Sequence, residues 1–249
     1  MKSPGLRIAC IPDTQVKPGV PTKHLGWIRQ YLEEKEPDAI VHLGDHWDMP
    51  SLSSYDKGKR SAEARRVARD IQAGNDGLAL LTPRTGAGRR VILRGNHEQR
   101  IERYVEDHPE LEGTVGYHCF NDVELGWEPV DFLDTITIGG VTFSHYFPRS
   151  GDGAISQTKR GAPSARAQVL REMRSCVAGH KQGLDTHIHH TGNRTIRGII
   201  AGSCYLHQES YLSPQGTNYW RGILMLHEVK NGNFNLMEVS LDYLKRRYS

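Results

Sequence analysis

The chain has 249 residues, of which 37% are hydrophobic and 24% charged, a composition typical of a folded globular protein and not of a disordered one. Its formal net charge of +3 permits nucleic-acid binding without indicating it. No apolar run is long enough to cross a membrane, and the 4 cysteines stand far apart without a secretory leader. We therefore expect reduced thiols, a cytoplasmic location and no membrane partner.

The first half of the chain alternates short apolar runs with helical patterns. The apolar runs predict strands over 6–11, 39–43 and 91–93. Apolar residues at helical spacing predict helices over 22–36 and 61–81, and a further helix that follows the last strand to about Glu106. This alternation predicts parallel strands joined by crossover helices, which is an α/β fold.

The second half of the chain has short β-type runs that are joined by Gly-rich turns. These runs lie over 131–138, 141–145, 175–178, 195–201, 222–227 and 234–239. We therefore expect a second mixed sheet that packs on the first, with helices outside, in a four-layer α-β-β-α sandwich that forms one domain over 1–249. The segment 113–131 has no clear period, and 241–249 is compatible with a surface helix or a frayed tail.

Side chains that can hold a metal follow the predicted strands in both halves of the chain. They are Asp13, Asp45, Asn96, His97, His145 and His180. Because ligand sites in α/β sheets gather at the carboxyl ends of strands, we expect these residues at one edge of the fold. Each of them alone would pass for an ordinary turn or cap residue. Their ordered coincidence indicates a metal site.

The motifs around these residues can be compared with a known family. In chain order they are Asp13-Thr14-Gln15, Gly44-Asp45-His46-Trp47-Asp48, Gly95-Asn96-His97-Glu98, His145 and Gly179-His180-Lys181-Gln182. This series resembles the calcineurin-like metallophosphoesterase superfamily, which reads Asp-x-His, Gly-Asp-x-x-Asp, Gly-Asn-His-Asp/Glu, a lone His and Gly-His-x-His. The layout is also similar to small bacteriophage phosphoesterases and to the DNA-repair nuclease branch.

The resemblance implies two divalent metal ions and assigns residues to them. Asp45 would bridge both ions. Asn96, His145 and His180 would complete one site, and Asp13, Gln15 and Gln182 would complete the other. Two cations roughly 3.5–4 Å apart would clamp the phosphoryl oxygens and activate a bridging hydroxide for in-line attack.

The resemblance also implies residues that act on the substrate without binding a metal. His97 would lie over the leaving oxygen and donate a proton to it. Asp48 would accept a hydrogen bond from His97 and fix its tautomer, although a simple helix-start carboxylate is a rival interpretation. Arg94 and His46 are candidate substrate-binding residues, and Arg94 is equally compatible with a solvated strand end.

Two amides stand where the family has histidine. Gln15 and Gln182 both belong to the same implied metal. An amide offers a carbonyl oxygen in place of an imidazole nitrogen, and oxygen ligands suit Mn²⁺ or Mg²⁺ better than Zn²⁺ or Fe. We therefore expect a preference for manganese and weak binding of this metal. Alternatively, His187, His189 or His190 supplies the missing nitrogen.

Basic and aromatic residues bear on the substrate class. The stretch 57–69 is rich in Lys and Arg and follows the second ligand segment. Aromatic residues that could stack on bases are Trp47, Tyr55, Tyr146, Phe147 and Trp220. We expect a phosphodiesterase or nuclease acting on DNA or nucleotide diesters. The alternatives are a phosphomonoesterase acting on nucleotides or phosphoproteins, and a noncatalytic nucleic-acid-binding module. Taken singly, each of these residues is as compatible with a solvated face or a core position.

Overall fold

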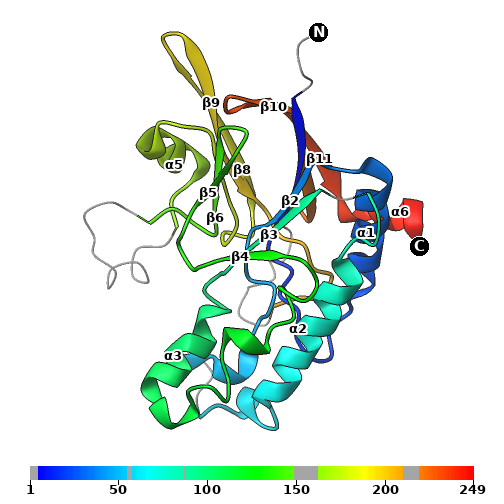
Figure 1. Ribbon diagram of the computed structural model, residues 1–249, viewed down its shortest axis with the longest axis vertical. Coiled ribbons are helices and arrows are strands. Elements are labelled where there is room, and N and C mark those ends of the chain that lie inside the picture. The colour runs from blue at the N-terminus through cyan, green and yellow to red at the C-terminus, as the bar shows by residue number, and fades with distance from the viewer. Residues whose placement is uncertain (1–4, 55–57, 87, 149–161, 210–218) are drawn as a thin grey trace.

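The computed structural model describes residues 5–54, 58–86, 88–148, 162–209 and 219–249 (Figure 1). Two mixed β-sheets pack on each other and carry helices on their outer faces, as the sequence predicted. Among the described residues, no helix is long and apolar enough to cross a membrane.

The first sheet has the strand order β11-β10-β1-β2-β3-β4. Its strands are β1 (Leu6–Ile11), β2 (Ala39–His42), β3 (Arg89–Leu93), β4 (Glu128–Val130), β10 (Gly222–Lys230) and β11 (Asn233–Ser240). β1 to β4 run parallel, and helices α1 (Lys23–Lys35) and α2 (Val67–Leu81) make the crossovers between the first three strands. The predicted β-α-β-α-β order is confirmed.

The hairpin of β10 and β11 differs from the prediction, because it was expected in the second sheet. It joins the first sheet instead, where β10 pairs antiparallel with β1. The first five residues of β10 are all buried, as in a central strand that is covered on both faces. An apolar run indicates that a strand exists, but it carries no information on which strand will be its neighbour.

The second sheet has the order β5-β6-β7-β9-β8. Its strands are β5 (Ile136–Ile138), β6 (Val141–Ser144), β7 (Cys176–Ala178), β8 (Leu184–Thr191) and β9 (Arg194–Ala201). Helix α5 (Ala165–Glu172) packs on the outer face of β8 and β9. This close approach requires Gly198 on β9, because a Cβ there would lie 2.2 Å from the carbonyl oxygen of Ala165.

One further helix differs from the sequence expectation, one agrees with it, and one settles an alternative that the sequence left open. α2 begins at Val67 and not at residue 61, because Ala64 adopts a positive φ of 61° that a continuous helix cannot contain. α3 (Gln99–Asp107) follows β3 as predicted. The end of the chain is the helix α6 (Leu241–Tyr248) and not a frayed tail, since Ser240 caps it and Leu244 is buried.

The core between the two sheets fixes the edge at which the functional loops meet. Ile8, Cys10 and Val41 of the first sheet pack in one cluster with Phe143 and Val177 of the second. β6 and β7 run parallel to each other, as β1, β2 and β3 do. The segments that follow these five strands therefore converge at one edge of the sandwich (Figure 1).

Candidate metal centre

The first two ligand segments run side by side beyond their strands. The backbone N–H of Gln15 donates to the carbonyl oxygen of Asp45 at 2.9 Å, and the N–H of Asp48 donates to the carbonyl of Val16 at 3.0 Å. This pairing holds Asp13 and Asp45 at neighbouring positions of the sheet edge, because the strands before them are parallel neighbours.

Asp45 occupies a sharp turn that requires glycine before it. Asp45 itself has a φ of 53° and Gly44 a φ of 99°. A Cβ on Gly44 would lie 2.6 Å from the Nδ1 atom of His145 and 2.9 Å from the backbone nitrogen of Gly95. The turn therefore lets three ligand segments approach one another, and the N–H of His97 donates to Asp45 Oδ1 at 2.9 Å.

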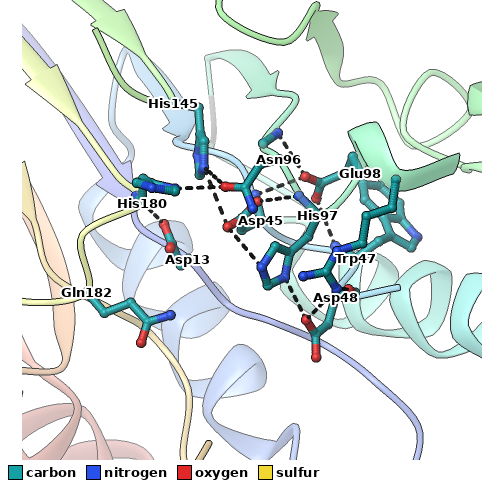
Figure 2. Close-up of polar contacts among 12 residues, drawn as sticks. Asp13, Asp45, Trp47, Asp48, Asn96, His97, Glu98, His145, His180 and Gln182 are labelled. Carbon is teal, nitrogen blue, oxygen red and sulfur yellow. Dashed lines mark hydrogen bonds and ion pairs between the residues drawn. The ribbon is translucent and has the colours of Figure 1, made fainter. Parts of the chain in front are cut away.

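Four of the predicted ligands form one compact cluster (Figure 2). Asn96 Oδ1 lies 3.0 Å from His145 Nε2 and 2.7 Å from His180 Nδ1. His145 Nε2 lies 3.5 Å from Asp45 Oδ2. Ligand atoms of Asp45, His145 and His180 all lie within 4.8 Å of one another, a separation suited to a shared cation.

The hydrogen bonds of His145 indicate that its Nε2 carries a lone pair. Its Nδ1 atom lies 2.8 Å from the carbonyl oxygen of Leu43, which can only accept, so Nδ1 holds the proton. Burial lowers the pKa of His145, so the ring is neutral. Its Nε2 lone pair then faces the carbonyl oxygen of Asn96, another acceptor. Two facing acceptors are stable when a cation lies between them, so these residues fit a metal.

Asp13 has a buried carboxylate oxygen that fits a second cation. Its Oδ1 atom accepts the N–H of His180 at 2.9 Å, while Oδ2 is buried without a hydrogen-bond partner. Burial and the nearby charge of Asp45 raise the pKa of Asp13 well above its usual range. A cation between Asp13 and Asp45 would relieve both the burial and the repulsion.

The two amides lie on the Asp13 side of the cluster. Gln15 is 1% exposed and follows Asp13 by two residues. Gln182 accepts a hydrogen bond from the hydroxyl of Tyr205 at 2.7 Å through its Oε1 atom. Figure 2 shows Gln182 beside Asp13 and apart from His145, in line with the predicted grouping of ligands.

His97 and Asp48 form a close pair beside the cluster. His97 Nδ1 lies 2.6 Å from Asp48 Oδ1, and His97 Nε2 lies 3.8 Å from Asp45 Oδ2. Burial alone would raise the pKa of Asp48, but the hydrogen bond from His97 and the charge of Lys17 hold it well below its usual range. The rival interpretation of Asp48 as a helix cap has no support, because the following 3-10 helix is capped at Met49 without a side-chain bond.

Glu98 is a buried acid to which the sequence analysis gave no role. Its carboxylate accepts four backbone N–H groups, those of Asp45, His46, Trp47 and Gly95, at 2.6–3.0 Å. It thereby ties the turn after β2 to the turn after β3. Burial and the charge of Asp45 raise the pKa of Glu98 to about 7. The only sequence signal was its place directly after the Asn96-His97 pair.

A pocket of about 820 Å³ opens in front of the cluster. Its lining includes the predicted site residues Gln15, Asp45, Asp48, Asn96, His97, His180 and Gln182. The same pocket is lined by basic residues from the stretch before α2, from the first turn of α2 and from α3, which are Lys59, Arg65, Arg66, Arg69 and Arg100. The expectation that the basic stretch flanks the site is therefore met for these residues, while Lys57 lies outside the described residues.

A sequence comparison decides the family. The family model described as Calcineurin-like phosphoesterase matches residues 6–217. The chain belongs to the calcineurin-like phosphoesterase family. The resemblance seen in the motifs is thus confirmed. Membership implies metal-dependent phosphoester hydrolysis and the binding of divalent metals, to which the cluster of Asp45, His145 and His180 corresponds.

Two relatives of this calcineurin-like phosphoesterase come from bacteriophages. The Gene 54 protein of Mycobacterium phage L5 is 28% identical over 228 residues, which cover 88% of each chain. The Gene 54 protein of Mycobacterium phage D29 is 28% identical over 192 residues, covering 73% of this chain and 71% of its own. Among solved structures, Vps29 from Chaetomium thermophilum is 10% identical with a TM-score of 0.43, over 94% of this chain and 97% of its own. The expected likeness to bacteriophage proteins is borne out.

The two candidate substrate-binding residues of this phosphoesterase are both buried. Arg94 is 3% exposed, forms an ion pair with Asp122, and its guanidinium lies 4.7 Å from the ring of Tyr117. It is therefore not a solvated strand end, and it is not among the residues that line the pocket. His46 is fully buried, with Nδ1 2.7 Å from the hydroxyl of Thr14 and Nε2 bonded to a carbonyl oxygen of α2. Both side chains are buried by contacts with residues that are distant in the sequence, so their burial could not be read from the neighbouring residues.

Three of the five candidate stacking residues are buried. Trp47 stacks on Phe120 in the core, with the ring centroids 4.3 Å apart. Tyr146 and Phe147 are 6% and 2% exposed. Tyr55 lies outside the described residues. Base stacking therefore gives no support for the substrate class.

The downstream histidines lie away from the pocket. His187, His189 and His190 are on β8, the edge strand of the second sheet, and His190 Nδ1 contacts the hydroxyl of Thr195 at 3.1 Å. None of the three is among the residues that line the pocket, whereas Gln182 is. The geometry thus favours Gln182 over these residues as the ligand at this position.

Changing Gln182 to His should shift the metal dependence of the phosphoesterase from Mn²⁺ toward Zn²⁺. The reason is that an imidazole nitrogen replaces an amide oxygen beside Asp13. Turnover with each metal and calorimetric titration of each metal would measure the change. The matched control is His189→Gln, which should leave both metal profiles as they are. A shift in the control and none in Gln182→His would assign the ligand to β8 instead.

Proposed function

We propose that this calcineurin-like phosphoesterase is a phosphodiesterase or nuclease that cleaves DNA or another nucleotide diester with two divalent cations, preferably Mn²⁺. One observation carries the proposal. A single pocket joins the ligand cluster to a wall of cations formed by Lys59, Arg65, Arg66, Arg69 and Arg100. A monoester needs only a phosphate-sized site, whereas a polymer carries further phosphates that require cations beyond the reacting one.

Two charges in this wall face solvent. Arg66 and Arg69 are both exposed. Among the described residues, neither forms an ion pair with a carboxylate, and Arg66 donates to the carbonyl oxygen of Arg65 at 2.7 Å. Asp70, the nearest acid in sequence to Arg69, instead accepts the backbone N–H of Ser51 at 2.8 Å. At Arg66 and Arg69, phosphates would therefore meet cations that are not paired with a described carboxylate.

Each group in the pocket has a chemical part in this proposal. Asp45, Asn96, His145 and His180 would hold one cation, and Asp13, Gln15 and Gln182 would share Asp45 in holding the other. Such cations polarise the phosphoryl group and lower the pKa of bound water. His97, whose ring orientation is fixed by Asp48, lines the pocket and would pass its Nε2 proton to the leaving oxygen. A module that only binds nucleic acid has no need of this proton donor.

The experiment compares bis-p-nitrophenyl phosphate with p-nitrophenyl phosphate in Mn²⁺, together with linear and circular DNA in single- and double-stranded form. We expect turnover of the diester and of DNA to exceed that of the monoester. Cleavage of the monoester alone would indicate a phosphomonoesterase. Salt-sensitive DNA binding with no turnover would indicate a noncatalytic binding module.

Replacing Arg66 and Arg69 together by Ala should raise the KM for DNA about tenfold at low salt. The slope of log KM against log salt should also fall by about two, because each lost phosphate contact lowers it by about one. The loss on bis-p-nitrophenyl phosphate should be much smaller, since that diester has no further phosphate. The matched control is Arg84→Ala with Arg246→Ala, two exposed arginines that do not line the pocket. An equal rise of KM in the control would show that the effect is not specific to the arginines that line the pocket, and the cationic wall would no longer support the proposal.

A further inference from the structure

A chain of five ionisable side chains leads from His97 away from the ligand cluster. His97 Nδ1 contacts Asp48 Oδ1 at 2.6 Å, and Asp48 Oδ2 contacts Lys17 Nζ at 2.8 Å. Lys17 Nζ also donates to both oxygens of Glu209, at 2.6 and 2.8 Å. Glu209 Oε1 in turn lies 2.6 Å from His207 Nε2. The chain of contacts thus alternates between cationic or imidazole groups and carboxylates, with the ammonium group of Lys17 at its centre.

The middle of this chain is shielded from water. The side chains of Asp48 and Glu209 are 7% and 4% exposed, and that of Lys17 is 19% exposed. An exposed lysine contributes little to a carboxylate's position because it is mobile and screened. A buried lysine between two carboxylates is held in one place, since losing either contact leaves a charge without compensation. Lys17 is therefore a fixed support for Asp48.

Both oxygens of Asp48 are engaged, each by a different partner. His97 takes Oδ1, and Lys17 takes Oδ2. The main chain is held as well, because Arg100 donates to the carbonyl oxygen of Asp48 at 2.6 Å. Rotation of this carboxylate would break the contact to His97 or the contact to Lys17. Arg100 also lies 3.7 Å from Asp48 Oδ1, so the direction of the His97 ring depends on Lys17 at 2.8 Å and, more weakly, on Arg100.

We propose that Lys17, anchored by Glu209, is a positioning residue that holds the Asp48 carboxylate so that His97 points at the leaving oxygen. The inference rests on the proposed phosphoester hydrolysis, and it applies to a monoester as to a diester. As the bond between phosphorus and the leaving oxygen breaks, the N–H bond at His97 Nε2 breaks and an O–H bond forms. Asp48 keeps its ion-pair contact with Nδ1, and Lys17 keeps all its protons.

A direct contact between Lys17 and the substrate phosphate is the competing role, because Lys17 also lines the pocket. The two roles differ in one respect. A positioning residue acts only through His97, so its loss should matter little once His97 is gone. A phosphate contact is independent of His97, so its loss should add to that of His97.

The test is a double-mutant cycle with Lys17→Met and His97→Ala on two diesters. Bis-p-nitrophenyl phosphate releases a phenolate that needs little protonation, whereas a dinucleoside phosphate releases an alkoxide that does. We expect Lys17→Met to lower kcat on the dinucleoside phosphate about tenfold more than on bis-p-nitrophenyl phosphate. In the His97→Ala background, Lys17→Met should change kcat by less than about twofold. The matched control is Lys35→Met, a surface lysine paired with Glu34 on α1.

Each outcome bears on Lys17 separately from the proposed function. An equal loss on both diesters, or an undiminished loss without His97, would overturn the positioning role. Lys17→Arg should restore part of the turnover, and Glu209→Gln should give a weaker form of the same leaving-group pattern. If Lys17→Met does not fold, kcat of these two variants on the two diesters is compared instead. A wild-type protein that cleaves only monoesters would defeat the diester proposal, and p-nitrophenyl and alkyl phosphates would then test Lys17. No turnover on any ester would overturn both.

Discussion

Asp45→Asn is expected to lower turnover about 10³-fold in this calcineurin-like phosphoesterase. Asp45 is the one carboxylate shared by both proposed cations, and cation binding contributes several kcal/mol to the stabilisation of the transition state. Asparagine keeps an acceptor for the N–H of His97, so the turn after β2 should stay folded. The measurements are kcat in Mn²⁺ and the number of metal ions bound by calorimetry.

The metal-free protein gives this prediction a second, independent signature. The charge of Asp45 raises the pKa values of Asp13 and Glu98, which means that the three acids repel one another when no cation is present. Asp45→Asn removes part of that repulsion, but it also removes the attraction to His145, His97 and His180 that outweighs burial and lowers the pKa of Asp45, so the melting temperature in chelator should change little. Glu98→Gln is the matched control, because this buried acid accepts four backbone N–H groups and binds no metal in the proposal. It should lower stability and leave the metal stoichiometry unchanged. Unaltered turnover in Asp45→Asn would refute the site.

His97→Ala is expected to lower kcat by about 10²–10⁴-fold, the range that proton donation to a leaving group contributes. Metal binding should persist, because His97 is not a ligand in the proposal, and DNA affinity should change little. The loss should be largest for alkoxide leaving groups. Asp48→Asn should reproduce the pattern at smaller amplitude, since it changes the orientation of His97 without removing it. Loss of metal binding in His97→Ala would assign this residue to the ligands instead.

The parts of the site that could be predicted from the sequence are the residues that directly follow a predicted strand. Asp13, Asp45 and Asn96 each follow a short apolar run, and parallel strands place such segments at one edge of a sheet. The helices α1 and α3 were also predictable, because the spacing of apolar residues that indicates a helix is contained within a single segment of the sequence.

The parts that could not be predicted depend on partners that are distant in the sequence. Arg94 is neutralised by Asp122, and Lys17 is held by Glu209, 192 residues further along the chain. Neither acid lies in a motif. The position of the β10–β11 hairpin was unpredictable for the same reason. β10 pairs with β1, which lies at the opposite end of the chain.

The separation of the ligand cluster from the cationic wall has an evolutionary consequence. The ligands sit on turns that follow the strands of both sheets, whereas Arg65 and Arg66 precede α2 and Arg69 lies in its first turn, all downstream of Asp45 and Asp48. Substitutions in the segment 58–69 can therefore alter the cationic wall while the ligand set stays in place. In the proposed enzyme, selection on this one segment would change which phosphoesters bind without changing how they are cleaved.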